Sequence, residues 1–425
     1  MFADTLNEEQ AAALAMVQQS RVSVLCGAPG VGKTYTCRAV LEWASSAGLS
    51  VALAAPTGKA AKRMEELTEY PASTIHRLLG PTKDRDGFKF EAGPENPLPY
   101  DLLILDETSM VDTWLMHSVM AAVDPDRTRV LLVGDPDQLP SIGPGTVLQD
   151  IISSGVVSVA RLTQIQRNAG DIVRACHAIK AGQGYEPSTI LDLDAGHNLR
   201  HVEASEDAIP GIIEALAAER LPARGYDPLW GIQVISPTNE KGLFSCGALN
   251  RVLRERLNQK TGWTTPEDPD EKPAANGNVF RPGDKIIQTK NEILPSTGTG
   301  TEYVVNGDMG IVEDVGRTIT VRFNTPDRLV SVKPNDCHLL LAYAITCHRA
   351  QGSEFPVTII PVSRAFGRFV DRCWIYTALS RAREICITVG EFSAIESAIG
   401  RVSAMRRRTG LTRALVDEYS KSIGI

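Results

Sequence analysis

A glycine-rich segment spanning residues 22–34 carries residue types that bind phosphate. Its sequence is VSVLCGAPGVGKT, in which G-x-x-x-x-G-K-T follows an apolar run and precedes a helical pattern. Glycines at this spacing let main-chain N–H groups face phosphate oxygens, the Lys33 ammonium reaches the β and γ phosphates, and the Thr34 hydroxyl is a ligand for Mg²⁺. The segment therefore predicts a site for a nucleoside triphosphate and Mg²⁺. We expect it to be lined by Gly27, Ala28, Pro29, Gly30, Val31, Gly32, Lys33, Thr34 and Tyr35.

Two carboxylates end a later apolar run, DLLILDET at residues 101–108. One carboxylate of the pair Asp106 and Glu107 can hold Mg²⁺ through water, and the other can take a proton from the water that attacks the γ-phosphate. Carboxylates at a strand end are often helix caps, but beside a P-loop they favour catalysis. We therefore predict that Lys33, Asp106 and Glu107 are catalytic, and that Thr34 and Asp106 are metal ligands.

Three further side chains can sense or neutralise phosphate charge. Gln138 follows the apolar run RVLLVGD, where its amide can contact the γ-phosphate. Arg167 in LTQIQRN and Arg381 in YTALSRARE can serve as arginine fingers, which neutralise charge that develops in the transition state of phosphoryl transfer. We add these three residues to the predicted catalytic set.

The runs that precede these side chains predict parallel β-sheets. From Arg21 onward, short apolar runs alternate with amphipathic helical stretches, which is the pattern of parallel strands joined by crossover helices. Loops at the carboxyl ends of such strands build ligand sites, which agrees with the positions of the candidate residues. A second pattern of this kind begins near Arg161 and includes GIQVISPT and VTIIPV. The sequence thus predicts an α/β fold with two α/β domains.

Two β-rich segments interrupt this pattern. Between Pro81 and Pro99 the chain is polar and rich in turn residues, and its FKF alternation suits an inserted β-hairpin. Between Arg281 and Pro334, short β-rich runs separated by NG, GD and PD turns predict a small antiparallel barrel. The predicted boundaries are 1–80 and 100–160 for the first α/β domain, 81–99 for the hairpin, 161–280 and 338–425 for the second α/β domain, and 281–337 for the barrel.

The composition is that of a globular chain. Its 425 residues correspond to two or three domains, and the hydrophobic share of 43% and charged share of 22% are ordinary. No apolar run approaches the ~18 residues that a membrane-spanning helix needs. The N-terminus lacks the pattern of a secretory signal, and the eight cysteines form no CxxC pair. We therefore expect a cytoplasmic protein with reduced thiols.

The charge pattern is uneven along the chain. The net charge of −7 by itself disfavours a polyanionic partner. Basic residues nevertheless gather at Lys59, Lys62 and Arg63. A second basic cluster, in the tail, comprises Arg401, Arg406, Arg407, Arg408 and Arg413. We interpret the tail cluster as a solvated helix face, with a nucleic-acid contact as the open alternative.

Eight segments occur in a characteristic order: GAPGVGKT, APTGKAAKRM, TIHRLLG, LDETSM, GDPDQLPSIGPG, LTQIQRN, YAITCHRAQGSEF and WIYTALSRARE. Together they resemble the motif series of superfamily 1 helicases, and in particular the RecD-like 5′-to-3′ DNA helicases of the 1B branch. The resemblance runs from Leu6 to about Glu384, nearly the whole chain. It implies two RecA-like domains, an SH3-like barrel, and an ATP-dependent DNA helicase that translocates 5′ to 3′ on single-stranded DNA.

The same resemblance assigns roles around the nucleotide. Gln10 is similar to the glutamine that contacts the adenine, and Gln138 is similar to the residue that links the γ-phosphate to the DNA track. The two arginine-finger candidates are implied to reach the triphosphate from the second domain. Gly352 resembles the glycine that lies against the phosphates, and Glu354 resembles the glutamate that contacts the ribose.

For the nucleic acid, the resemblance implies six contacts to the single strand: Thr57, Lys59, His76, Thr346, His348 and Gln351. Short hydroxyl, amide and cationic side chains at loop ends can bond to backbone phosphates without reading the sequence. The predicted hairpin matches the position of the wedge that splits duplex DNA at a fork. Phe88 and Phe90 are then the residues expected to stack on a base pair.

Two other activities stay open. The chain can be an ATP-switched protein that clamps single strands or displaces bound proteins without separating a duplex. A P-loop phosphotransferase would need an acceptor site, which the sequence does not display. Since both arginine fingers lie in the same chain as the P-loop, we expect a monomer. The expected partners are single-stranded DNA, forked or tailed duplex DNA, and replication or repair proteins.

Overall fold

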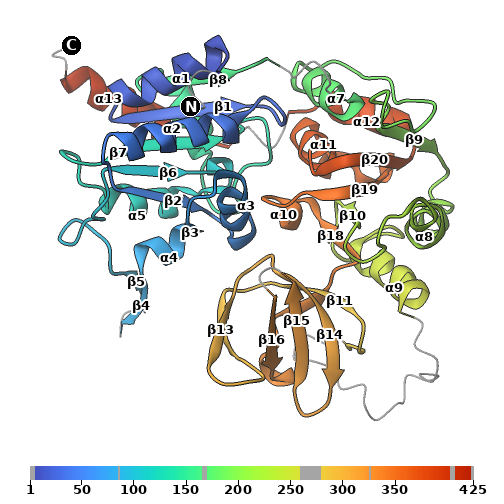
Figure 1. Cartoon of the computed structure of the whole chain (residues 1–425). Coiled ribbons are helices and arrows are strands. Elements are labelled where there is room, and N and C mark those ends of the chain that lie inside the picture. Colours follow the sequence, from blue (N-terminus) through green and yellow to red (C-terminus); the bar gives the residue numbers. More distant parts are fainter. Residues whose placement is uncertain are drawn as a thin grey trace.

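The computed structural model describes residues 5–84, 87–164, 170–258, 279–324, 327–402 and 407–422. Within these residues the chain folds around two parallel sheets and a smaller antiparallel sheet (Figure 1). In the view of Figure 1 the two parallel sheets lie side by side, and the antiparallel sheet lies below them. The predicted α/β class with parallel sheets is confirmed.

The first parallel sheet has the strand order β3-β2-β6-β7-β1-β8. Its strands are β1 (Val22–Gly27), β2 (Val51–Ala55), β3 (Ala72–Thr74), β6 (Leu102–Leu105), β7 (Arg129–Gly134) and β8 (Ser158–Leu162). Its helices are α1 (Glu8–Gln19), α2 (Lys33–Ser46), α3 (Gly58–Thr68), α4 (Ile75–Leu79), α5 (Thr113–Ala121) and α6 (Val147–Ser154). We call this sheet and its helices the first unit.

The strands of the first unit are apolar on both faces because helices cover both faces. Along β6, Leu103 and Leu105 belong to one hydrophobic cluster, whereas Leu102 and Ile104 belong to another on the opposite face. Successive side chains of a strand point to opposite faces, so a strand covered on both sides needs a continuous apolar run. The loops that follow the carboxyl ends of these strands lie outside the packed core and can therefore build a site.

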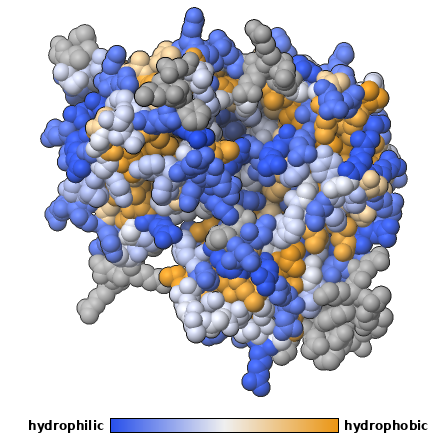
Figure 2. All heavy atoms as spheres, viewed as in Figure 1, coloured by the Kyte–Doolittle hydropathy of each residue, from blue (hydrophilic) through white to orange (hydrophobic). Residues whose placement is uncertain are grey.

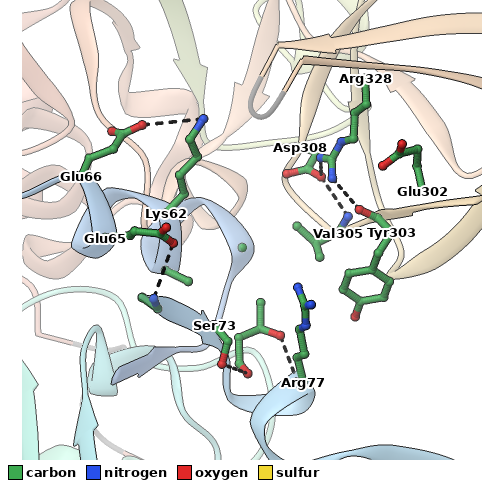
Figure 3. A pocket seen from close by; sticks show the side chains of 14 residues that line it. Lys62, Glu65, Glu66, Ser73, Arg77, Glu302, Tyr303, Val305, Asp308 and Arg328 are labelled. Atoms are coloured by element: carbon green, nitrogen blue, oxygen red, sulfur yellow. Dashed lines mark hydrogen bonds and ion pairs between the residues drawn. The ribbon is translucent and has the colours of Figure 1, made fainter. Parts of the chain in front are cut away.

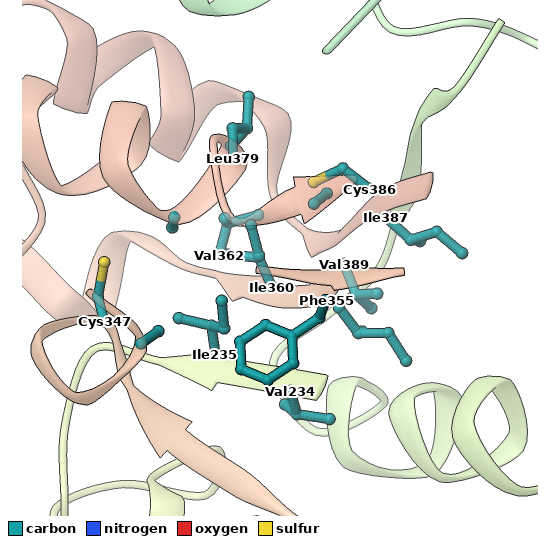
Figure 4. Close-up of a cluster of buried hydrophobic side chains, with 14 of the residues drawn as sticks. Val234, Ile235, Cys347, Phe355, Ile360, Val362, Leu379, Cys386, Ile387 and Val389 are labelled. Atoms are coloured by element: carbon teal, nitrogen blue, oxygen red, sulfur yellow. The ribbon is translucent and has the colours of Figure 1, made fainter. Parts of the chain in front are cut away.

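The second parallel sheet has the order β18-β10-β19-β20-β9. Its strands are β9 (Leu199–Glu203), β10 (Ile232–Ser236), β18 (Ala344–Thr346), β19 (Phe355–Val362) and β20 (Ala382–Gly390). Its helices are α7 (Asp171–Lys180), α8 (Ile209–Ala215), α9 (Cys246–Leu257), α10 (Cys347–Ala350), α11 (Arg372–Leu379) and α12 (Phe392–Ile399). Figure 4 shows its core, in which Phe355 packs among side chains of the neighbouring strands. We call this sheet and its helices the second unit.

Among the described residues, the strands that pair antiparallel lie in two stretches of the chain. After α4, strand β4 (Pro81–Asp84) pairs with β5 (Gly87–Phe90). The larger antiparallel sheet has the order β16-β15-β14-β11-β17 and its own apolar core. It is formed by β11 (Lys285–Gln288), β14 (Met309–Val315), β15 (Ile319–Asn324), β16 (Asp327–Val332) and β17 (Leu339–Leu341), with the separate pair β12 (Glu292–Pro295) and β13 (Thr301–Val304) beside it. Strand β17 extends this sheet beyond residue 337, the predicted limit of the insertion.

The last helix, α13 (Leu411–Ser422), lies on the first unit, which corrects the predicted second domain of 161–280 and 338–425. Leu411 and Leu415 pack against the core of the first unit, and the hydroxyl of Thr409 donates to Oδ2 of Asp150 at 2.7 Å. The helix presents an apolar stripe at i and i+4, which predicts burial but does not specify against which unit. A boundary drawn from the order of elements therefore misplaced it.

The surface and the thiols agree with the composition. Hydrophilic side chains cover most of the face in Figure 2, and hydrophobic ones form small patches. Among the described residues, no helix is long and apolar enough to cross a membrane. All eight cysteines lie in the described part of the chain, and each is buried and outside any disulfide bond.

Candidate functional site

The P-loop turns between the end of β1 at Gly27 and the start of α2 at Lys33. Gly32 adopts a left-handed conformation with φ 90°, and a Cβ there would lie 2.6 Å from Nε2 of Gln10, so glycine is required. The ammonium of Lys33 donates to the carbonyl oxygens of Gly27 at 2.7 Å and Ala28 at 3.2 Å. The cation is thus folded onto the loop, and a bound phosphate would compete for it.

Lys33 lines a cavity of about 280 Å³ between the two units, here called the P-loop cavity. From the first unit its lining includes Ala28, Pro29, Gly30, Gly32, Lys33, Thr34, Arg63, Asp106, Glu107 and Gln138. From the second unit its lining includes Gly352, Glu354, Ser380 and Arg381. The structure therefore brings the predicted loop, the carboxylates, the glutamine and one arginine finger into one cleft.

The remaining predicted nucleotide residues lie beside this cavity or outside the described chain. Gln10 is buried against the P-loop and caps α1 by accepting a hydrogen bond from the main-chain N–H of Asn7 at 3.1 Å. Val31 is buried in the first unit, and the hydroxyl of Tyr35 bonds to the hydroxyl of Thr5. Arg167 falls outside the described residues.

The paired carboxylates create a local excess of negative charge. Asp106 follows β6, and the main chain of Glu107 is left-handed with φ 49°, which is rare for a residue with a side chain. Burial and the charge of Glu107 raise the pKa of Asp106 to about 6, against the opposing charges of Lys33 and Arg63. A buried carboxylate under such repulsion gains stability from a cation. With the Thr34 hydroxyl in the same cavity, the donor set fits Mg²⁺.

Hydrogen bonds join the two units at the back of the P-loop cavity. Nη2 of Arg381 donates to Oε1 of Gln138 at 2.9 Å, and both side chains are buried. The hydroxyl of Tyr376 donates to Oδ2 of Asp135 at 2.5 Å, and burial raises the pKa of that phenol. These bonds tie α11 of the second unit, and the residues just after it, to the loop that follows β7.

One cavity residue was not singled out as a site residue from the sequence. Arg63 of α3 forms an ion pair with Glu354, so the carboxylate expected to contact the ribose is held by a cation of the first unit. The sequence showed Arg63 only as part of a basic cluster. Neither composition nor motif spacing indicates that this side chain crosses the cleft, because the pairing depends on how the two units sit together.

A second depression, here called the groove, adjoins the P-loop cavity and has a volume of about 240 Å³. Its lining includes five of the six predicted single-strand contacts: Thr57, Lys59, His76, His348 and Gln351. The sixth, Thr346, is buried at the start of α10. Arg349 adds a cation, and Asp112 is the acidic side chain of the lining, so basic groups predominate. This balance suits a polyanion.

Several groove residues are already engaged. The Lys59 ammonium lies 4.8 Å from the ring centroid of Phe355, and burial lowers the pKa of Lys59 to about 8. Nε2 of Gln351 donates to the carbonyl oxygen of Leu139 at 2.7 Å. Burial lowers the pKa of His76, whose Nδ1 has no hydrogen-bond partner among the described residues. Lys59 and Gln351 thus also contact the protein, which the motif resemblance did not imply.

The structure assigns Phe90 a packing role. Its ring centroid lies 5.4 Å from that of Trp114 and 5.8 Å from that of His76, and it packs against the core of the first unit. The sequence predicted that Phe90 stacks on a base pair, and these contacts give the ring a packing role as well, because a ring at the base of a hairpin can reach the adjacent helices. The side chain of Phe88 lies outside the described residues.

A larger cavity of about 570 Å³ lies between α3, β3 and α4 of the first unit and the β13 side of the antiparallel sheet (Figure 3). Its charges are largely paired: Nζ of Lys62 lies 3.7 Å from Oε1 of Glu66, and Arg328 bonds to Asp308. Paired charges give no net attraction for phosphate. The groove, and not this cavity, therefore has the charge expected of a strand-binding surface.

Two family models match the chain: "AAA domain" over residues 5–204 and "UvrD-like helicase C-terminal domain" over residues 341–389. The RecBCD enzyme subunit RecD of Mycolicibacterium smegmatis is 30% identical over 446 residues, which cover 96% of this chain and 75% of that protein. The chain belongs to the RecD family. The ATP-dependent RecD2 DNA helicase of Deinococcus radiodurans is 35% identical over 420 residues, or 97% of this chain. This RecD-family chain spans about half, 52%, of the length of that relative.

Solved structures share the fold of this RecD-family chain. Pif1 helicase from Bacteroides, in complex with ADP-AlF3 and single-stranded DNA, matches with a TM-score of 0.53 at 20% identity, covering 99% of this chain and 98% of that one. Pif1 helicase from Candida albicans matches with a TM-score of 0.50 at 17% identity, covering 99% of both chains. At these identities the likeness concerns the arrangement of elements.

Proposed function

We propose that this RecD-family chain is an ATP-dependent DNA helicase that translocates 5′ to 3′ on single-stranded DNA. The observation that carries the proposal is the bond between Arg381 and Gln138, which joins the two units inside the P-loop cavity. A nucleotide in that cavity changes the contact between the units, and such a change is what a two-domain motor needs. The names of the relatives favour the same activity. The polarity rests on the motif resemblance.

In the proposed reaction, each predicted residue acts on a particular part of ATP. Main-chain N–H groups of the P-loop hold the phosphates, and Lys33 exchanges its loop carbonyls for phosphate oxygens. Thr34 and Asp106 hold Mg²⁺, which when bound neutralises phosphate charge. Glu107 takes the proton of the attacking water.

The remaining residues position the nucleotide and neutralise its charge. Gln10 contacts the adenine and Glu354 the ribose, after Glu354 leaves Arg63. Arg381 and Arg167 stabilise the charge that develops on the γ-phosphate. Gln138, which lies in the first unit, detects the γ-phosphate. Gly352 of the P-loop cavity lies beside Thr57 of the groove, so the phosphate site and the groove are neighbours.

The single strand occupies the groove in this proposal. Its cationic and amide groups bond to backbone phosphates, and Lys59 exchanges its contact with Phe355 for a phosphate. The hairpin of β4 and β5 acts as the wedge at the fork, with Phe88 as the stacking residue. The antiparallel sheet of β11 and β14–β17 is the SH3-like insertion of the second RecA-like domain.

The domain and assembly predictions carry over with two changes, one at α13 and one at the end of the antiparallel sheet. The first RecA-like domain comprises 1–80, 100–160 and α13, and the second comprises 161–280 and the residues from 342 to α12. We expect a monomer in the cytoplasm, where the eight buried thiols stay reduced. Forked or tailed DNA and replication or repair proteins are the proposed partners.

Strand separation on tailed duplexes tests the proposal. The chain should unwind a duplex with a 5′ tail in the presence of ATP and Mg²⁺, and Lys33→Ala should abolish this activity. Unwinding only from a 3′ tail would refute the polarity. ATP-dependent displacement of streptavidin from a biotinylated strand, without separation of either duplex, would favour the remodelling alternative.

The hairpin provides a second arm of this experiment. Deletion of residues 87–93 should stop strand separation and preserve ATP hydrolysis that is stimulated by single-stranded DNA. If the deletion variant separates strands as well as the unaltered chain does, the wedge assignment is wrong.

A further inference from the structure

One loop connects the P-loop cavity with the groove. It follows β7 and spans residues 135–145, here called the connecting loop. Gln138, near its beginning, lines the P-loop cavity, whereas Ser141, Ile142 and Gly143 line the groove. The side chain of Ile142 is 82% exposed, so it offers an apolar surface in the groove against which a base could lie. The shape of this loop therefore affects both sites.

The N-terminus of α5 fixes one side of the connecting loop. Both the main-chain N–H and the hydroxyl of Thr113 donate to the carbonyl oxygen of Pro144 at 3.0 Å. A Cβ on Gly143 would lie 2.1 Å from Oδ2 of Asp112, so the loop approaches this helix as closely as glycine permits. On this side the loop is held by backbone contacts within the first unit.

Arg407 holds the other side. Its Nη1 donates to the carbonyl oxygens of Gly143 at 2.7 Å and Gly145 at 2.9 Å, and its Nη2 donates to that of Ser141 at 2.6 Å. Three carbonyl dipoles that converge on one point repel one another unless a donor group stands between them. A guanidinium offers a rigid planar set of donors that satisfies all three, and a lysine ammonium cannot match this planar array.

The position of Arg407 in the chain links this contact to the relation between the units. Nη2 of Arg401 donates to the carbonyl oxygen of Val370 in the second unit at 2.9 Å. Thr409 and Thr412 bond to Asp150 in the first unit. Arg407 thus lies where the C-terminal segment has passed from the second unit to the first.

We propose that Arg407 is a positioning residue of the groove, which holds the connecting loop in the conformation that presents Ile142 to a single strand and Gln138 to the nucleotide. This inference rests on the proposed function, because it names a residue that shapes the proposed strand site. Arg407 bonds to carbonyl groups of the protein and makes no contact with the DNA phosphates. Burial, and after it the charge of Arg407, lowers the pKa of His348, which lines the groove.

The test compares Arg407→Ala with Arg408→Ala, since Arg408 is a neighbouring exposed arginine. Binding of a fluorescent oligo-dT strand is measured over a range of KCl concentrations. Arg407→Ala removes the hydrogen bonds that a charged guanidinium donates to the connecting loop. The variant should therefore bind oligo-dT about tenfold more weakly than the unaltered chain does. Arg407→Lys should recover part of this loss, and Arg408→Ala should bind as the unaltered chain does.

The salt dependence separates positioning from direct contact. A residue that contacts phosphate contributes about 0.7 to the slope of log K against log salt on a single strand. Arg407→Ala should leave this slope unchanged. A slope reduced by about that amount would overturn the inference and make Arg407 a phosphate contact. Unchanged affinity of Arg407→Ala would overturn it as well.

Amide hydrogen exchange tests the same inference without DNA. Exchange in a peptide covering residues 138–145 should be faster in Arg407→Ala than in Arg408→Ala, while peptides from β1 and β6 should be unaffected. Equal exchange in the two variants would overturn the positioning role. If the unaltered chain binds no oligo-dT but the exchange difference is present, the proposed function fails and the loop-holding role of Arg407 stands.

Discussion

Nη2 of Arg381 donates a hydrogen bond to Oε1 of Gln138 at 2.9 Å, and this bond crosses from the second unit to the first beside the P-loop. Arg381 is also held by the carbonyl oxygen of Thr377, to which its Nε donates at 3.1 Å. The guanidinium is therefore buried, oriented and adjacent to Gln138, the predicted sensor of the γ-phosphate. An arginine that needs little reorganisation can stabilise a transition state efficiently.

The first prediction concerns this arginine. Arg381→Ala should lower kcat for ATP hydrolysis in the presence of single-stranded DNA by about 10³, which is the lower end for removal of an arginine finger. Steady-state hydrolysis provides the measurement. Arg383→Ala is the matched control, because Arg383 is exposed and lies near Glu384. A kcat of Arg381→Ala close to that of the control would exclude a finger role.

The second prediction concerns the buried charge of Asp106. Its pKa is raised from 3.8 to about 6, so ionisation costs stability in the folded state as pH rises through that interval. Asp106→Asn should therefore raise the free energy of unfolding at pH 7 by about 2 to 3 kcal/mol while abolishing hydrolysis. The gain should shrink as the pH falls through about 6 and vanish below 3.8.

Asp101 provides the opposite case at the other end of β6. Hydrogen bonds from Arg127 and Ser50 hold the pKa of Asp101 below its usual range. Asp101→Asn should lower stability at neutral pH, and this loss should begin to shrink only as the pH falls below 3.8 toward the lowered pKa. Urea unfolding of both variants from pH 3 to pH 8 measures the two effects. If Asp106→Asn lowers the free energy of unfolding at pH 7, the ionised Asp106 does not destabilise the fold, and the claim that burial and Glu107 disfavour its charge is wrong.

The third prediction concerns Lys59. Because burial lowers the pKa of Lys59 to about 8, its charge is present at pH 7 and is largely lost by pH 9. Affinity for single-stranded DNA should fall over this interval more than in Lys59→Arg, whose guanidinium stays charged. Titrations of labelled oligo-dT at constant ionic strength give both curves. Parallel curves would indicate that Lys59 remains on Phe355 when DNA binds.

The fourth prediction separates packing from strand splitting at the hairpin. Phe90→Ala should destabilise the chain by about 2 kcal/mol, below the range for a fully buried ring, because Phe90 packs on Trp114 and is only partly buried. Phe88→Ala should leave stability nearly unchanged and slow strand separation. Thermal unfolding and a tailed-duplex assay on the two variants make the comparison. Reversed phenotypes would exchange the two roles.

The sequence was sufficient for features that depend on local order. Glycine spacing at the P-loop, the apolar runs of both sheets and the carboxylates after β6 follow from neighbours in the chain. The cavity then collects Lys33, Asp106, Gln138 and Arg381 because the carboxyl ends of parallel strands face one cleft.

Features that depend on contact between distant elements were not predicted. The ion pair of Arg63 with Glu354 and the placement of α13 require the relative position of the two units. The tail cluster was interpreted as a solvated face, yet Arg407 donates to three main-chain carbonyl groups. Charge and periodicity predict that such residues need partners, but they do not identify which partners the fold supplies.

The central claim is that ATP hydrolysis in the cleft between the units is coupled to single-stranded DNA. The most direct test is the rate of ATP hydrolysis with and without oligo-dT, measured for the unaltered chain and for Lys33→Ala, with single-stranded RNA of equal length as a comparison. Strong stimulation by DNA in the unaltered chain, abolished in the variant, is the predicted result. Hydrolysis that is indifferent to both nucleic acids would contradict the account.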